Sequence, residues 1–187
     1  MNRKENNQID DFAERLASNA VRLQRLLPGT IEEVWEYLTD GELRKTWLAA
    51  GHIPLVRGER FTLSWRNDEL TDPPGTPPPG VSGSHQLECE VVDVEPPTKL
   101  SFTWGPGLVT FSLTHAGPGE VVLTVLHESI SDGENVIRVS AGWHTHLDIL
   151  RDIRTCSKSS PFWESFVANR DHYQRRASSF TLTGDAT

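Results

Sequence analysis

The chain has 187 residues, of which 36% are hydrophobic and 24% are charged, a composition typical of one folded domain. Its net charge of −8 argues against nucleic acid as a partner, because phosphate binding needs clustered lysines and arginines. The sequence has no apolar run long enough to cross a bilayer, and residues 1–11 lack the apolar core of a secretory signal, so we expect a cytoplasmic protein.

The first part of the chain is expected to form one strand between short helices. A weak apolar pattern of Ile9, Phe12 and Leu16 predicts a short helix within residues 1–20. Alternating side chains over 21–27 predict a strand that ends at Pro28-Gly29. Thr30 and Glu33 have the spacing of a capping box and predict a helix, with a further short helical turn over 42–48. The buried side of the first of these helices would hold Ile31, Val34, Trp35 and Leu38.

From about residue 61 to residue 127 the apolar pattern has a period of two. Half-buried strands are predicted over 61–65, 85–94, 100–104, 109–113 and 121–127. The apolar side chains change parity at Val91-Val92, which predicts a β-bulge. Short breaks between the strands favour an antiparallel meander. The segment 71–83 contains five prolines among glycines, which predicts a surface loop at a sheet edge or a cavity mouth.

The last part of the chain is expected to be helical. Over 136–154, Val136, Val139, Trp143, Leu147, Leu150 and Ile153 fall on one face of a helical wheel. Arg138, Thr145, Asp148, Arg151 and Asp152 fall on the other, which we expect to face solvent. His146 lies within the apolar face. After a break at 157–160, Ser160 as N-cap and Pro161 predict a second helix, with Phe162, Phe166 and Tyr173 on one stripe.

These elements predict an α+β fold in which a curved antiparallel sheet wraps around a long C-terminal helix. We expect an extension over residues 1–20, one domain over 21–176 and a flexible tail over 177–187. A sheet curved around a helix need not fill its interior with its own side chains, and small-molecule sites favour such concave, apolar places.

Several segments resemble a known family. They are Ile31–Asp40 with Trp47, Val94-Glu95-Pro96-Pro97 before Leu100–Trp104, Leu123–His127, and Gly142-Trp143 with Leu147. In this order they resemble the START-like (SRPBCC) superfamily, and more narrowly the bacterial homologues of the activator of the heat-shock protein 90 ATPase. The resemblance covers about residues 20–175 and implies the helix-grip fold, with a deep hydrophobic cavity between the sheet and the C-terminal helix. It also implies either ligand binding, a co-chaperone role, or cyclase-like or hydrolase-like activity.

Two histidines are expected near this cavity. Strand parity places His127 with Leu123 and Val125, and the helical wheel places His146 on the side that faces the sheet. The two rings are either neutral core groups bonded to a backbone carbonyl or a nearby side chain, contacts for a polar group of a ligand, or proton carriers. His144 and His146 lie about 200° apart on the helix and do not form a metal pair. We expect His144 to form a surface ion pair with Asp148.

The aromatic residues complete the expected site. We assign Trp35 to packing and expect the other inward aromatic and apolar residues to bind a ligand. The expected ligand-binding residues are Trp47, Phe61, Trp65, Phe102, Trp104, Phe111, His127, Trp143, His146, Leu147 and Leu150. Cys89 and Cys156 lack metal-ligand spacing and are expected to be reduced thiols. We identify no catalytic nucleophile, metal ligand or cofactor motif.

The sequence therefore favours a module that binds a small hydrophobic or aromatic molecule. Two alternatives stay open: a co-chaperone that acts on a chaperone ATPase, and an enzyme that uses His127 or His146 as a base. The partner would be a small hydrophobic molecule or a chaperone, and the protein a monomer or a homodimer.

Overall fold

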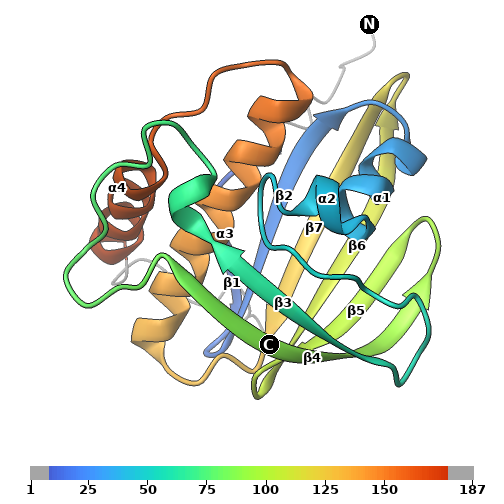
Figure 1. Ribbon diagram of the computed structural model, residues 1–187, viewed down its shortest axis with the longest axis horizontal. Helices are drawn as coiled ribbons and strands as arrows, with labels where there is room; N and C mark the ends of the chain where they lie inside the picture. The colour runs from blue at the N-terminus through green and yellow to red at the C-terminus, as the bar shows by residue number, and fades with distance from the viewer. Residues whose placement is uncertain (1–8, 177–187) are drawn as a thin grey trace, which may run out of the picture.

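The computed structural model describes residues 9–176, in which seven strands form one curved antiparallel sheet (Figure 1). The strands are β1 (Glu14–Ala17), β2 (Ala20–Pro28), β3 (Arg60–Arg66), β4 (Ser84–Glu95), β5 (Lys99–Trp104), β6 (Gly107–Gly117) and β7 (Glu120–Glu128). Their order is β1-β2-β7-β6-β5-β4-β3. The meander from β3 to β7 is confirmed, and β2 joins it by pairing with β7.

The helices are α1 (Ile31–Thr39), α2 (Gly41–Arg44), α3 (Gly133–Arg154) and α4 (Phe162–Arg175), with a 3₁₀ turn η1 (Asn67–Glu69) after β3. In Figure 1, α3 lies between β2 of the sheet and α4. This arrangement is the helix-grip fold, so the expected α+β class is confirmed. No helix within residues 9–176 is long and apolar enough to span a membrane.

Several local predictions are confirmed. The capping box is present, since the Thr30 hydroxyl accepts from the Glu33 amide at 3.2 Å and the Glu33 carboxylate accepts from the Thr30 amide. The pairing of β4 with β5 shifts between Val91 and Asp93, as the change in parity predicts. The second short helix is shorter than expected, because α2 ends at Arg44.

The helix expected within residues 1–20 is wrong for the part that the structure describes. Residues 14–17 form β1, an edge strand that pairs with β2. Phe12 stacks on the His172 ring at 4.1 Å between centroids, and the Ala13 amide donates to the Tyr173 hydroxyl at 2.8 Å. These contacts with α4 and β2 outweigh the weak helical pattern. Residues 1–8, and the tail expected over 177–187, lie outside the described residues.

The expected solvent face of α3 is also wrong in part, because α4 packs against it. Thr145 and His144 are buried. The Tyr173 hydroxyl accepts from the Ala13 amide and shares a hydrogen bond with Nδ1 of His144, 2.8 Å away. Burial lowers the pKa of His144 to about 3, so the contact of its Nε2 with Asp148 at 3.4 Å is not a surface ion pair. Helix α3 is covered by the sheet on one side and by α4 on the other.

Candidate functional site

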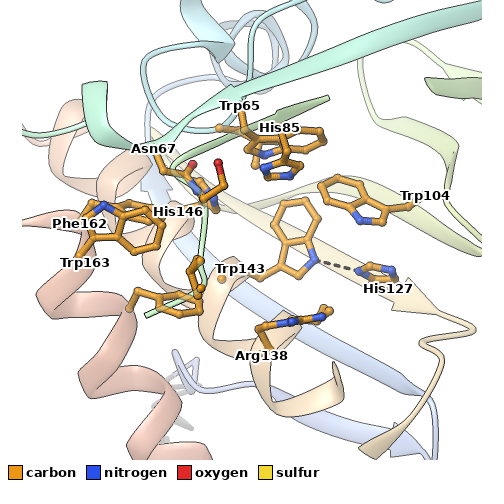
Figure 2. Close-up of a pocket in the computed structure, with 17 residues that line it drawn as sticks. Trp65, Asn67, His85, Trp104, His127, Arg138, Trp143, His146, Phe162 and Trp163 are labelled. Carbon is orange, nitrogen blue, oxygen red and sulfur yellow. Dashed lines mark hydrogen bonds between the residues drawn. The ribbon is translucent and has the colours of Figure 1, made fainter. Parts of the chain in front are cut away.

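A cavity of about 480 Å³ lies between the sheet, α3 and α4. Figure 2 draws the residues that line it. They are Leu48, Trp65, Asn67, Gly80, Val81, Ser82, His85, Trp104, His127, Arg138, Val139, Gly142, Trp143, His146, Phe162, Trp163 and Phe166. This volume lies within the range of small-molecule sites, and the lining is mostly aromatic.

Five of the residues expected at the site line this cavity: Trp65, Trp104, His127, Trp143 and His146. The other six are not among the lining residues and belong to the buried core: Trp47, Phe61, Phe102, Phe111, Leu147 and Leu150. Trp47 is held away by its indole N–H, which donates to the Tyr37 carbonyl at 2.9 Å. The three phenylalanines pack against one another, with Phe102 5.7 Å from Phe61 and 5.5 Å from Phe111 between ring centroids.

Other lining residues were not expected from the sequence. Helix α4 contributes Phe162, Trp163 and Phe166, although its apolar stripe predicted only packing. Asn67 and His85 lie at the ends of strands, where parity gives no signal, and Arg138 lies at the exposed end of α3. Three more lining residues, Gly80, Val81 and Ser82, belong to the proline-rich segment 71–83. The sequence placed this segment in a loop at a sheet edge or a cavity mouth.

One wall of the cavity is a continuous series of aromatic rings. His85 stacks on Trp65 with 4.4 Å between centroids and 2° between planes. Trp65 lies edge-on to Trp104 at 5.0 Å, and Trp104 lies 5.2 Å from Trp143. The rings come from β4, β3, β5 and α3, so the curvature of the sheet brings them together. Such a wall offers both faces and edges to a flat aromatic molecule.

The two cavity histidines are neutral and have opposite tautomers. The indole N–H of Trp143 can only donate, so Nδ1 of His127, 3.1 Å away, accepts and the ring carries its proton on Nε2. The Trp47 carbonyl can only accept, so Nδ1 of His146, 2.7 Å away, donates and its Nε2 keeps a lone pair. Burial lowers the pKa of each ring to about 4. His127 thus offers an N–H group, and His146 offers an acceptor.

The proline-rich loop holds the start of α4 against the cavity. The Thr71 hydroxyl accepts from the Phe162 amide at 2.9 Å, and the Pro74 carbonyl accepts from the Trp163 amide at 2.9 Å. The expected cap by Ser160 is therefore wrong, because the cap residue is Pro161 and Thr71 provides the side-chain oxygen. The Trp163 indole N–H donates to Asp68 of η1 at 2.7 Å. These bonds fix the three aromatic residues of α4 in the cavity wall.

The residues that line the cavity include no cysteine, aspartate or glutamate. Cys89 is a buried free thiol outside the lining, and burial raises its pKa to about 11. Across residues 9–176, no three His, Cys, Asp or Glu side chains lie together as metal ligands would. What the lining can do is surround a flat apolar molecule and exchange hydrogen bonds with its polar groups.

The sequence profile of the family described as "Activator of Hsp90 ATPase homolog 1-like protein" matches residues 28–154. No curated protein matches the chain in sequence. A protein from Bordetella parapertussis solved by NMR is 32% identical; the match covers 90% of this chain and 91% of that one, with a TM-score of 0.74.

Two more distant structures share the fold. A conserved protein of unknown function from Enterococcus faecalis is 17% identical, with 92% of each chain covered and a TM-score of 0.66. CalU16 from Micromonospora echinospora is 18% identical, with 84% of this chain and 88% of that chain covered and a TM-score of 0.60.

Proposed function

Since this chain belongs to the Activator of Hsp90 ATPase homolog 1-like family, whose fold encloses space between sheet and helix, we propose that it binds a small, flat aromatic molecule in the cavity. The observation that carries the proposal is the aromatic wall of Trp65, Trp104 and Trp143 around a cavity of about 480 Å³. Indole rings at these positions give large apolar contact areas and favour aromatic partners.

The size of the cavity supports an affinity sufficient for a carrier or a sensor. Burial of about 200–300 Å² of apolar ligand surface contributes on the order of 5–8 kcal/mol before the costs of association. Those costs place the dissociation constant in the micromolar range or weaker. The aromatic and imidazole side chains of the lining are already held by packing and hydrogen bonds, so they need little further ordering on binding.

Gly142 offers a direct test, because it lines the cavity and a Cβ built on it would meet no atom within 4 Å. Gly142→Leu should place its side chain in the cavity and abolish binding of naphthalene and related uncharged aromatics, as followed by tryptophan fluorescence and calorimetry. The glycine lies inside α3, so leucine also improves helix propensity and the fold should remain intact.

Gly142→Ala is the matched control, since one methyl group leaves most of the cavity free and should preserve binding. The melting temperature of both variants should equal or exceed that of the parent protein. Unchanged binding by Gly142→Leu would contradict the proposal, as would a lack of saturable binding by the parent protein to every aromatic compound tested.

A further inference from the structure

One polar atom in the cavity wall has no partner. Only two side-chain polar atoms of residues 9–176 are fully shielded and also lack a hydrogen bond: Nε of Arg44 and Oδ1 of Asn67. Nη1 of Arg44 donates to the carbonyls of Leu38 and Thr39, and Arg44 is not among the residues that line the cavity. Asn67 lines the cavity itself, and only 8% of the residue is exposed.

An unpaired amide oxygen at such a buried position is costly and rare in folded proteins. A leucine would fill the same place without leaving a polar atom unpaired. The backbone of Asn67 is fixed by its amide, which donates to the Gly83 carbonyl at 2.7 Å. The side chain is therefore held in the wall by its neighbours, with no hydrogen bond of its own to account for its position.

A second acceptor lies on the same side of the cavity. In the view of Figure 2, Asn67 and His146 lie on one side of Trp143, and His127 lies on the other. Nδ1 of His146 is used by the Trp47 carbonyl, so the free Nε2 of this ring accepts hydrogen bonds. Phe162 packs against the same ring at 5.2 Å between centroids. This end of the cavity thus combines an acceptor nitrogen of His146 and the uncharged amide of Asn67 with aromatic surface.

We propose that the ligand carries a hydroxyl or N–H group on its aromatic ring, and that this group donates a hydrogen bond to Oδ1 of Asn67, which rotation of the side-chain amide brings to the cavity, with Nε2 of His146 as the neighbouring acceptor. The inference rests on the proposed function, because it specifies the ligand of the same cavity. A carboxylate or phosphate group has no hydrogen to donate to these two acceptors, so it would not be recognised in this way.

Four probes that share the naphthalene ring test this specificity by calorimetry at pH 7: naphthalene, 2-naphthol, 2-methoxynaphthalene and 2-naphthoate. The parent protein should bind 2-naphthol about tenfold more tightly than 2-methoxynaphthalene, because only the free hydroxyl can donate to Asn67. The 2-naphthoate anion should bind more weakly than 2-naphthol, because it has no hydrogen to donate to Asn67 or His146.

Asn67→Leu should reduce the ratio between 2-naphthol and its methyl ether to about one, while naphthalene still binds. Because the variant removes an unpaired buried oxygen, its melting temperature should be equal to or above that of the parent protein. A residue needed only for structure would show the opposite, a loss of stability with no change in the ratio. The ratio in the parent protein tests the proposal even where the variant fails to fold.

The outcomes separate the two proposals. Equal or tighter binding of 2-methoxynaphthalene by the parent protein would overturn the role of Asn67 and leave aromatic binding intact. Failure of all four probes to bind would overturn both proposals. A preference for 2-naphthol that persists in Asn67→Leu would also overturn the role of Asn67, because the donor would then be recognised elsewhere.

Discussion

The indole N–H of Trp143 in α3 donates to Nδ1 of His127 in β7 across 3.1 Å, inside the cavity wall. The bond joins the long helix to the sheet at the place where the cavity separates them. It also determines the tautomer of His127, because the indole nitrogen has no lone pair to offer.

We expect Trp143→Phe to lower the free energy of unfolding by about 1–2 kcal/mol beyond the loss of packing, since Nδ1 of His127 loses its partner. A double-mutant cycle with His127→Phe isolates this contribution, and urea unfolding measures it. Additive effects of the two substitutions would show that the bond does not contribute to stability.

The stability of the protein should fall as the pH is lowered from about 6.5 to about 4. Burial lowers the pKa of His127 and His146 to about 4, and that of His144 to about 3. Between pH 6.5 and pH 4 these histidines bind protons in the unfolded chain but stay neutral in the folded chain. Their contribution to the free energy of unfolding is therefore complete above pH 6.5 and is lost as the pH falls. Each ring contributes roughly 3 kcal/mol by pH 4.

Urea unfolding at a series of pH values measures this loss. Replacement of His127, His144 or His146 by Gln should each remove one part of the slope. A flat profile in the parent protein between pH 6.5 and 4.5 would be incompatible with neutral buried rings.

Thr71→Val should destabilise the protein by about 1 kcal/mol, because the amide of Phe162 loses the hydroxyl that caps α4. Thr71→Val should also weaken the binding of aromatic molecules, since Phe162, Trp163 and Phe166 at the start of α4 line the cavity. Thr71→Ser keeps the hydroxyl and serves as the control. Hydrogen exchange of the first turn of α4 should accelerate only in the valine variant; equal exchange rates in both variants would argue against the cap.

Asp148→Ala should be one of the most destabilising substitutions in the chain, by about 3–5 kcal/mol. Arg25 is fully buried on β2, and its Nε and Nη2 donate to Oδ1 of Asp148 at 3.2 and 3.1 Å. Without the carboxylate, that guanidinium keeps only its backbone partners and a longer contact with Asp11.

Glu95→Ala provides the comparison for Asp148→Ala. Glu95 pairs with Lys99 on the surface at 3.3 Å, and such exposed pairs contribute less than about 1 kcal/mol. Thermal or urea unfolding of both variants should therefore give clearly different losses. Similar small losses would show that Arg25 is not dependent on Asp148.

The fold could be predicted largely from the sequence because its signals are local. The period of two gives each strand of the meander, and Thr30 with Glu33 gives the start of α1. The wrong predictions concern positions where contacts with distant segments outweigh the local sequence pattern. Phe12 is half-buried against rings of α3 and α4, and the start of α4 is capped by Thr71, which lies ninety-one positions earlier in the chain.

The site could be predicted only in part. Parity and the helical wheel identify which side chains face inward, which is sufficient for Trp65, Trp104 and His146. They do not distinguish a cavity wall from a filled core. Phe102 and Phe111 are therefore predicted as ligand-binding residues, although both are buried in the core. Asn67 follows the end of β3, and its importance rests on an unpaired atom that only three-dimensional packing reveals.

The neutrality of the two cavity histidines has a consequence for calorimetry. At pH 7, neither ring has a charge to gain or lose when a neutral guest enters, because both pKa values lie near 4. Complex formation should then exchange no protons with the medium. The enthalpy measured in Tris should match that in phosphate, although the ionisation heats of these two buffers differ widely.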